Sequence, residues 1–286
     1  MGILCDICKS EKVTFHHRHF AFPIIACRKC GYVRARNIPL QKEINTFYSR
    51  YNSESDSGID AITSKRYNVL LNYLESFRKT NNILDYGCGR GHFLKKAKER
   101  GWNVMGIEIS ETAFIHLNKN NIPYIEKDIP VDLHNTFDAA FCIEVIEHVL
   151  RPDIAIQEIA VLLRPGGCLY LTTPNIRSLS LSYLKNKSYF ISYPEHLNYF
   201  TVKSIKTMLN VGFSISKIRT TGITPFKKTD PLNNEININD IENCRTLVEK
   251  KTLFLFFKWS VNFILNLLKK GDTIKVFAVK RERLRS

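Results

Sequence analysis

The chain has 286 residues, 44% of them apolar, which is enough for one large folded domain with a smaller appendage. Its formal charge of +15 is concentrated at the end, where residues 250–286 hold ten Lys or Arg against two acids, a net +8. This distribution argues against a basic active site and for a terminus that meets anionic lipid or nucleic acid. Residues 1–20 contain no apolar run of seven residues, so we expect no signal peptide and a cytoplasmic protein.

Two C-x-x-C pairs lie near the start of the chain, Cys5 with Cys8 and Cys27 with Cys30, separated by 18 residues. This spacing is typical of a zinc ribbon, in which four thiolates hold one tetrahedral ion. Disulfides do not persist in a reducing cytosol. Residues 1–36 are therefore predicted to form a zinc ribbon that the metal stabilises, because so short a segment has little core. Three histidines between the pairs are alternative ligands or surface residues of a hairpin: His16, His17 and His19.

Residues 37–80 are predicted to connect this ribbon to the next domain. A short helix is expected to begin at Pro39, and the polar run 52–58 is expected to be mobile. Apolar residues then recur at helical spacing, which predicts an amphipathic helix leading into the first strand of the main domain. These residues are Ile62, Tyr67, Leu70, Leu71, Leu74 and Phe77.

A short apolar strand, a glycine-rich turn and the start of a helix follow one another in residues 82–94. This is the layout of the first βα unit of a nucleotide-binding sheet. Glycines at the alternate positions 87, 89 and 91 allow the backbone to turn sharply and to approach a ligand closely. The spacing differs from the dinucleotide fingerprint G-x-G-x-x-G, and Asp85 precedes the first glycine. A carboxylate at this point suits a cationic ligand better than a phosphate.

The string from Leu84 to Gly91 resembles motif I of the class I methyltransferases that use S-adenosylmethionine (SAM). The resemblance implies that the methionine end of SAM lies over the glycine turn. Glu108 ends the next predicted strand, 21 residues after Gly87, and is then the carboxylate that accepts the ribose hydroxyls. Asp128 is expected near the adenine amino group. The residues that the resemblance assigns to the cofactor are Asp85, Gly87, Cys88, Gly89, Gly91, Glu108, Ile109, Asp128, Ile129 and Cys142.

Strands and helices alternate after residue 81, with strands expected near 82–86, 103–108, 123–126, 137–142 and 167–173. This alternation predicts an α/β fold with a doubly wound parallel sheet. Leu163–Gly167 resembles the turn before the fifth strand of the family. Segments 213–220 and 272–280 resemble its last two strands, which form an antiparallel pair. The expected fold is a Rossmann-like seven-stranded sheet built from residues 81–220 and 271–286, with the small zinc ribbon before it.

The fourth predicted strand ends in Glu144-x-x-Glu147-His148, at the edge where ligands bind in open α/β sheets. The string from Phe137 to Val149 resembles that of ubiquinone-pathway O-methyltransferases. Methyl transfer to a hydroxyl needs an aligned acceptor and a group that takes its proton. His148, with a pKa expected near the working pH, is the predicted base. Two alternatives remain: the two glutamates and His148 share a divalent cation, as in some relatives, or the glutamates cap and bond the backbone at the start of a helix.

A segment that minimal versions of the fold lack follows the fifth strand, in residues 176–200. It ends in Pro-Glu-His-Leu-Asn-Tyr-Phe, which resembles a signature of the same group, placed over the cofactor site. His196 is therefore a second candidate base or an acceptor-binding residue. The alternative is a histidine that pins this loop to a helix beginning near Thr201. His148, Glu147 and His196 form the predicted catalytic set.

Residues 221–270 are predicted to form an insertion between the last two strands. Its first half, 224–243, is polar and expected to be loop, whereas 252–268 is an apolar helix with Lys258, Asn262 and Asn266 on one narrow face. Such a helix reaches about 24 Å, short of the roughly 30 Å hydrocarbon core, so we do not expect it to span a bilayer. Its apolar face and the basic residues up to 286 predict peripheral contact with the inner membrane face. The alternatives are packing on the core or a dimer interface.

Two classes of function follow from these features. A zinc ribbon, a tyrosine-rich connector and motif I together resemble bacterial methyltransferases of surface-polysaccharide and lipid-linked sugar pathways. The resemblance implies SAM-dependent transfer of a methyl group to a hydroxyl of a sugar, glycan or other small molecule. The alternative is an RNA methyltransferase that holds nucleic acid with the ribbon and the basic tail, although aromatic and basic residues are not interleaved as in a known RNA-binding motif. A binding module without activity is disfavoured because every cofactor position is filled.

Overall fold

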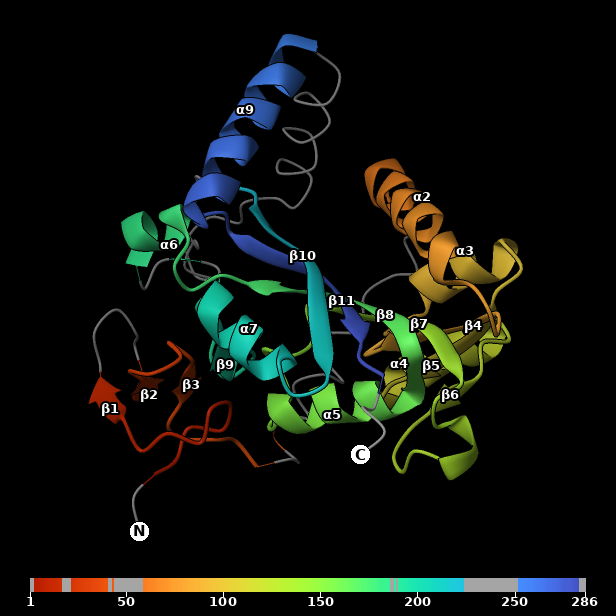
Figure 1. The fold of residues 1–286 in the computed structure, drawn as a ribbon, viewed down its shortest axis with the longest axis horizontal. Helices are drawn as coiled ribbons and strands as arrows, with labels where there is room; N and C mark the ends of the chain where they lie inside the picture. Colours follow the sequence, from red (N-terminus) through yellow and green to blue (C-terminus); the bar gives the residue numbers. More distant parts are fainter. Residues whose placement is uncertain are drawn as a thin grey trace.

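The computed structural model describes residues 3–16, 22–40, 43, 59–185, 188, 190–223 and 252–282, with side chains from 259 onward in the last range (Figure 1). Several predicted features lie outside these residues. They are most of the helix expected after Pro39, the polar run 52–58, the polar first half of the insertion, and His17 and His19.

The larger sheet has seven strands in the order β10-β11-β8-β7-β4-β5-β6. These are β4 (Asn82–Tyr86), β5 (Asn103–Ile107), β6 (Tyr124–Ile125), β7 (Phe137–Ile143), β8 (Leu163–Pro174), β10 (Phe213–Thr221) and β11 (Thr273–Lys280). Strands β6, β5, β4, β7 and β8 pair in parallel, and β11 runs antiparallel to both β8 and β10. The predicted doubly wound sheet with an antiparallel last pair is therefore confirmed. The segment Leu163–Gly167, predicted as a turn, belongs instead to β8, because Leu163 pairs with Phe137 of β7.

Helices cover both faces of this sheet because side chains of its central strands alternate between the faces. In β7, Ala139 and Phe141 face one hydrophobic cluster, whereas Ala140 and Cys142 face the other. The first face packs against α2 (Ala61–Leu74), α3 (His92–Glu99) and α4 (Glu111–Lys119), and the second against α5 (Pro152–Leu162) and α7 (Val202–Leu209). Shorter elements are the 3-10 turns η1 (Glu75–Phe77) and η2 (Val131–Leu133) and helix α6 (Leu179–Leu184). The predicted amphipathic helix before the first strand is α2.

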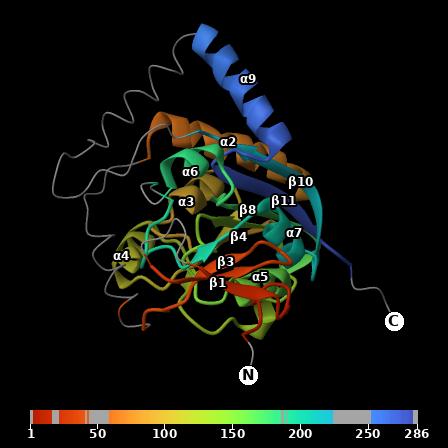
Figure 2. The same cartoon turned by 90° about the vertical axis from the view of Figure 1, so that its left-hand side faces the viewer.

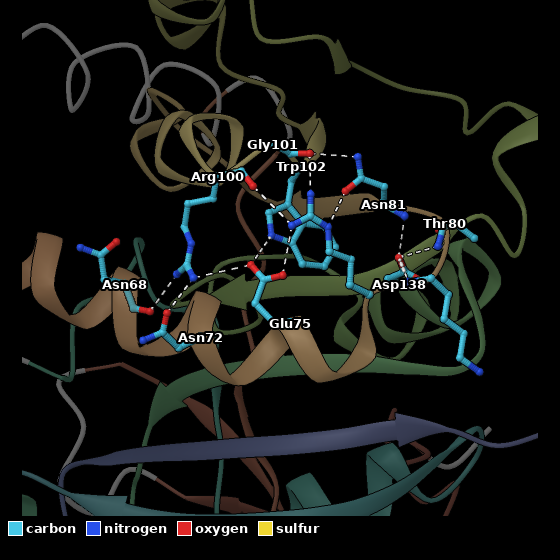
Figure 3. Close-up of polar contacts among 11 residues, drawn as sticks. Asn68, Asn72, Glu75, Thr80, Asn81, Arg100, Gly101, Trp102 and Asp138 are labelled. Carbon is cyan, nitrogen blue, oxygen red and sulfur yellow. Dashed lines mark hydrogen bonds and ion pairs between the residues drawn. The ribbon is translucent and has the colours of Figure 1, made fainter.

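A buried carboxylate fixes the entry into β4 (Figure 3). Asp138, fully buried in β7, accepts backbone N–H bonds from Lys79, Thr80 and Asn81 at 2.7 to 2.8 Å. Its other oxygen accepts from Nε of Arg164 at 2.6 Å. Burial opposes ionisation, but Arg164 and these N–H groups hold the pKa of Asp138 below its ordinary value. The charged carboxylate thus anchors the loop that leads into the strand before the glycine turn.

The ribbon forms a smaller four-stranded sheet in the order β1-β2-β3-β9. Its own strands are β1 (Val13–His16), β2 (Ile24–Cys27) and β3 (Val33–Ala35), whereas β9 (Asn198–Tyr199) comes from the segment after β8. Val33 pairs with Tyr199, and Arg34 pairs with Asn198. Figure 1 shows the ribbon, in red, beside β9 and α7. The ribbon sheet is therefore completed by the segment that carries the signature around His196.

Helix α9 (Thr252–Leu268) projects away from the main sheet in both views (Figures 1 and 2). The predicted polar face turns toward the protein, since Oδ1 of Asn262 accepts from the Gly222 amide at 2.7 Å and Oδ1 of Asn266 from the Thr220 amide at 3.1 Å. Among the side chains described in this helix, from residue 259 onward, the exposed large apolar ones are Trp259, Phe263, Ile264, Leu267 and Leu268. Within the described part of the chain, no helix combines the length and the apolar character needed to cross a membrane.

Candidate functional site

The glycine turn between β4 and α3 has a backbone that glycine adopts far more easily than other residues. Gly87, Gly89 and Gly91 have φ values of 75°, 52° and 74°, in the left-handed region. A Cβ at Gly87 would lie 2.6 Å from Val145, whereas a Cβ at Gly89 would project into open space. The turn is therefore packed tightly at one glycine and open at the next, as expected of a cradle for a ligand.

Two carboxyl groups border this turn, as predicted. The Glu108 carboxylate accepts the Gly89 N–H at 2.7 Å and the N–H groups of Ile109 and Ser110 at 2.8 and 2.9 Å. Asp85 is buried at the carboxyl end of β4, where burial and then the charge of Glu108 raise its pKa to about 7. A cationic ligand beside Asp85 would favour its charged form. This site therefore fits the sulfonium and amino groups of SAM.

Three further predicted cofactor residues follow the carboxyl ends of the neighbouring strands. Ile109, directly after Glu108, is 56% exposed. Asp128 is exposed and Ile129 half-buried, both just beyond β6. Because parallel strands end at one edge of the sheet, these residues lie along the same edge as Asp85.

The two predicted cysteines of the cofactor site have their thiols in the core. Cys88 is buried, and its Sγ would lie 2.4 Å from a Cβ at Gly106, so the side chain packs on β5 while the backbone forms the turn. Cys142 is fully buried within β7, where burial and then the charge of Glu147 raise its pKa well above the ordinary value. Burial, followed by the charge of Asp85, also raises the pKa of Cys88, so neither thiol is ionised at neutral pH.

Strand β7 ends in a turn that carries the predicted catalytic residues. Glu144 has a φ of 53°, a left-handed value that is uncommon for a residue other than glycine. Hydroxyls of β8 hold both carboxyl groups: Thr172 donates to Glu144 at 2.7 Å, and Thr173 donates to Glu147 at 3.0 Å. The alternative in which the glutamates begin a helix is wrong, because residues 144–151 form turns and α5 begins only at Pro152.

Burial changes the protonation of Glu147 and His148. Burial, followed by the charge of Glu144, raises the pKa of Glu147 well above its ordinary value, which favours the protonated form of this carboxyl. Burial and then His196 lower the pKa of His148 to about 4. The prediction that His148 has a pKa near the working pH is therefore wrong for the ligand-free protein. Nδ1 of His148 lies 3.0 Å from the carbonyl oxygen of Glu195, so Nδ1 carries the hydrogen and Nε2 the lone pair.

His196 lies directly beside His148, with the ring centroids 4.7 Å apart and edge to face. Its Nδ1 lies 3.0 Å from the carbonyl oxygen of Phe190. Nε2 of His148 is 3.9 Å from Oε1 of Glu147, and this buried oxygen accepts no hydrogen bond from an amide, hydroxyl or imidazole of the described residues. The ligand atoms of Glu147, His148 and His196 lie within 4.8 Å of one another. The structure thus brings the three predicted catalytic residues into one cluster.

This cluster also lies next to the glycine turn, because Val145, between the two glutamates, is the residue that fills the space at Gly87. The sequence does not single out the residues that support it. The Thr172–Thr173 hydroxyls can be recognised only once β7 and β8 are known to be neighbours. Asn198, which bonds the turn at Ile146 and Val149, lies inside the signature around His196 but does not stand out there.

The four cysteines of the ribbon come together in the manner predicted for a metal site. Their Sγ atoms lie within 4.8 Å of one another, with Cys5 and Cys30 3.7 Å apart and Cys8 and Cys27 3.5 Å apart. Thiolates in a tetrahedral zinc site with Zn–S bonds of about 2.3 Å are about 3.8 Å apart. A disulfide would require about 2.0 Å. The residues therefore fit one tetrahedral ion.

A family model described as a methyltransferase domain matches residues 60–216, more than half of the chain. The chain therefore belongs to the methyltransferase domain family, and its fold is that of class I SAM-dependent enzymes. A SAM-dependent methyltransferase from Archaeoglobus fulgidus covers 76% of this chain and 94% of its own, with a TM-score of 0.50 and 20% identity. The PH0226 protein from Pyrococcus horikoshii covers 82% and 99%, with a TM-score of 0.52 and 16% identity. At these identities the likeness concerns the fold alone.

Sequence relatives match a shorter part of the chain. The ubiquinone biosynthesis O-methyltransferase of Dechloromonas aromatica is 36% identical over 102 residues, which are 32% of this chain and 44% of the relative. The enzyme of the same name from Coxiella burnetii is 35% identical over 118 residues, 37% of this chain and 50% of the relative. The chain thus spans about half the length of the curated relatives it matches.

Proposed function

We propose that this protein transfers the methyl group of SAM to a hydroxyl group of a sugar, glycan or other small molecule. The main support is the contact of Val145 with Gly87, which brings the Glu147–His148 turn against the candidate SAM cradle. Asp85, Glu108 and the glycine turn would hold the cofactor, which supplies an electrophilic methyl group on a sulfonium. The name of the matched relatives, ubiquinone biosynthesis O-methyltransferase, supports oxygen as the accepting atom.

His148 is the proposed acceptor of the hydroxyl proton. Its imidazole is neutral at pH 7, and its lone pair is on Nε2 because Nδ1 donates to Glu195. A pKa of about 4 makes it a weak base toward a free hydroxyl. The hydroxyl proton becomes more acidic as the oxygen gains the methyl group, so transfer to Nε2 is favoured late in the reaction.

The Oε1 atom of Glu147 has no hydrogen-bond donor among the described residues, which favours a second arrangement in which Glu147, His148 and His196 bind a divalent cation. His196 replaces Glu144 of the predicted cation set. A buried carboxyl oxygen with no donor among the described residues and two imidazoles within 4.8 Å are a suitable ligand set. Glu147 would bind the cation as a carboxylate, so the cation would take the place of the carboxyl proton. An acceptor oxygen that joined these ligands would lose its proton more easily.

Turnover of radiolabelled SAM tests both arrangements. The acceptor is supplied as soluble, lipid and RNA fractions of a bacterial extract, and label in the RNA fraction would support the nucleic-acid alternative. His148→Ala should lower kcat about 10²- to 10⁴-fold without changing the Kd for SAM, whereas His134→Ala, outside the cluster, should have no effect. Loss of turnover on chelation, with ribbon metal retained, would support the cation. Full activity of both His148→Ala and His196→Ala would refute both arrangements of the catalytic cluster.

We further propose that zinc is the ion of the cysteine cluster. The support is the set of four thiols and their spacing of 3.5 and 3.7 Å, which suit a soft tetrahedral ion. Metal analysis of the purified protein should give one zinc per chain, and Cys8→Ser should lower that content. A protein that binds no zinc at neutral pH would contradict this assignment.

A peripheral membrane contact through α9 is the remaining proposal, and it would suit a lipid-linked acceptor. The asparagines of the helix face β10, so its apolar side is exposed: Trp259 is 64% and Leu267 71% exposed. Lys270 follows just after the helix, and a cation beside an exposed apolar face fits an anionic lipid surface, whereas Nζ of Lys269 donates to Ile218 and Asn266 on the polar side. The end of α9 lies beside the carboxyl end of β8, because Asn175 donates to the carbonyl oxygen of Lys269 at 3.1 Å. The membrane would therefore lie near the catalytic edge.

Liposome flotation tests this contact. The protein should float with vesicles that contain anionic lipid, and less so as salt rises. Combined Trp259→Ser, Phe263→Ser and Leu267→Ser should abolish flotation, whereas Val131→Ser, which removes a 76% exposed side chain on η2, should not. Failure to float at low salt would refute the contact. A concentration-dependent dimer that the triple variant dissociates would indicate instead that a second copy covers the helix.

A further inference from the structure

Asn198 lies buried between the ribbon and the catalytic turn, with 3% of its surface exposed. Its Nδ2 donates to the carbonyl oxygens of Val149 at 2.6 Å and Ile146 at 3.2 Å. Its backbone N–H donates to the carbonyl oxygen of Glu147 at 2.9 Å. One residue thus binds three carbonyl groups of the turn that carries Glu147 and His148.

The ribbon holds the opposite end of this amide. The Tyr32 hydroxyl donates a short hydrogen bond to Oδ1 of Asn198. Tyr32 is 2% exposed, and its only polar side-chain atom is the hydroxyl that donates to Asn198. An amide whose oxygen accepts from a phenol must present its N–H groups to the carbonyls of the turn. We name this arrangement the Tyr32–Asn198 clamp.

Backbone hydrogen bonds join the same parts of the chain. The Ala35 amide, at the end of β3, donates to the carbonyl oxygen of Leu197 at 2.8 Å, and the Leu197 amide donates to that of Glu147 at 2.8 Å. The bonds therefore run without a break from the ribbon, through the segment after His196, to the turn before His148. Such a connected set of buried bonds can fix the direction of a side chain within a narrow range.

We infer that Tyr32 and Asn198 are positioning residues for methyl transfer, through which the ribbon fixes the 146–149 turn and thereby aims Nε2 of His148. The inference rests on the proposed function, because it ties the clamp to the proposed proton acceptor. Neither side chain belongs to the glycine turn or to the Glu147–His148–His196 cluster. Breaking the clamp therefore leaves the reacting groups present but allows them to move, which should affect the chemical step more than cofactor binding.

Two substitutions break the clamp at different ends while they conserve shape. Tyr32→Phe removes the hydroxyl that fixes the amide. Asn198→Asp keeps an acceptor for Tyr32 but removes the donors to Ile146 and Val149. Tyr170→Phe is the matched control, because it also removes the hydroxyl of a buried tyrosine, in β8, outside the clamp.

The full-length protein is assayed with labelled SAM and the extract fraction that the wild type methylates. Tyr32→Phe should lower kcat about tenfold, the effect of one lost buried hydrogen bond, and Asn198→Asp, which loses the bonds to Ile146 and Val149, should lower it at least as much. The Kd for SAM should stay unchanged within about twofold in both variants. The double variant should lose no more than Asn198→Asp alone, because both changes act through one amide. Hydrogen exchange of the peptide that covers 195–199 should accelerate in Tyr32→Phe, whereas Tyr170→Phe should leave exchange and kcat unchanged.

Wild-type kcat in both clamp variants would overturn the inference, as would unchanged exchange at 195–199 in Tyr32→Phe. Equal losses in Tyr170→Phe would also overturn it, because they would indicate a general effect of removing a buried hydroxyl. If Asn198→Asp fails to fold, Tyr32→Phe decides the question alone. A wild type that binds SAM but methylates no fraction would instead refute the proposed function.

Discussion

Replacing Asp85 with Asn should stabilise the ligand-free protein and weaken SAM binding, two effects of opposite sign from one substitution. The carboxyl is buried at the carboxyl end of β4, and burial, followed by Glu108, raises its pKa from 3.8 to about 7. A carboxyl with a raised pKa destabilises the folded state once it ionises. Its burial is therefore a cost that a cationic ligand would offset.

The size and the pH dependence of this effect follow from the pKa. A rise from 3.8 to about 7 corresponds to roughly 4 kcal/mol lost from folding when the carboxyl is charged. Well below pH 3.8 the carboxyl is protonated in both the folded and the unfolded state, so the loss of folding stability vanishes. It grows between pH 4 and 7 and is complete above pH 7. Asp85→Asn should thus gain up to about 4 kcal/mol at pH 7.5 and little at pH 4.

Urea denaturation at both pH values measures the stability, and calorimetry measures the SAM affinity at pH 5.5 and 7.5. In the wild type the affinity should fall as pH decreases, because the protonated carboxyl attracts no cation. In Asp85→Asn the affinity at pH 7.5 should be at least tenfold weaker and depend little on pH. The exposed control Asp132→Asn should change neither quantity. An Asp85→Asn protein that is less stable at pH 7.5, or that binds SAM as the wild type does, would refute the role of Asp85 as a buried partner of a cationic ligand.

Three further predictions use other parts of the structure. Gly87→Ala should destabilise the free protein by about 1–2 kcal/mol or more in urea denaturation, because its Cβ would lie 2.6 Å from Val145 at positive φ. Gly89→Ala, whose Cβ would project into open space, should mainly weaken SAM binding in calorimetry. Asp138→Ala should cost about 3–5 kcal/mol in urea denaturation, because the half-buried Arg164 and three backbone N–H groups of the loop lose their carboxylate. Unchanged stability would contradict the anchoring role of Asp138. Removing the proposed ribbon metal with a strong chelator should accelerate hydrogen exchange in residues 195–199, because β3 of the ribbon pairs with β9. Unchanged exchange would show that the segment containing β9 keeps its structure without the ribbon.

The sheet and the glycine turn could be predicted from the sequence because their signals are local. Short apolar strands, the glycines at 87, 89 and 91 and the acid 21 residues after Gly87 report the βα unit directly. The two C-x-x-C pairs likewise predict that their four thiols meet at one point, and the Sγ atoms do lie within 4.8 Å of one another. These features depend on neighbours a few residues apart, or on motifs with fixed spacing.

The environment of the proposed catalytic residues could not be predicted, since it depends on contacts between distant segments. The pKa of His148 is low because the fold buries it beside His196, 48 residues later in the chain. Tyr32 and Asn198 meet across 166 residues. The direction of α9 was equally hidden, because its asparagines could have faced water. They bind the β10 edge instead, and the apolar side is left exposed.

Carbon-13 NMR of products made with [methyl-¹³C]SAM tests whether the protein transfers the methyl group of SAM to a hydroxyl oxygen. The chemical shift of the label reports the atom that received it. The wild type, incubated with the soluble and lipid fractions, should give a methyl carbon bonded to oxygen. Gly87→Arg, which would fill the cradle at Val145, should give none. Label bonded only to nitrogen or carbon, or a Gly87→Arg protein as active as the wild type, would contradict the account.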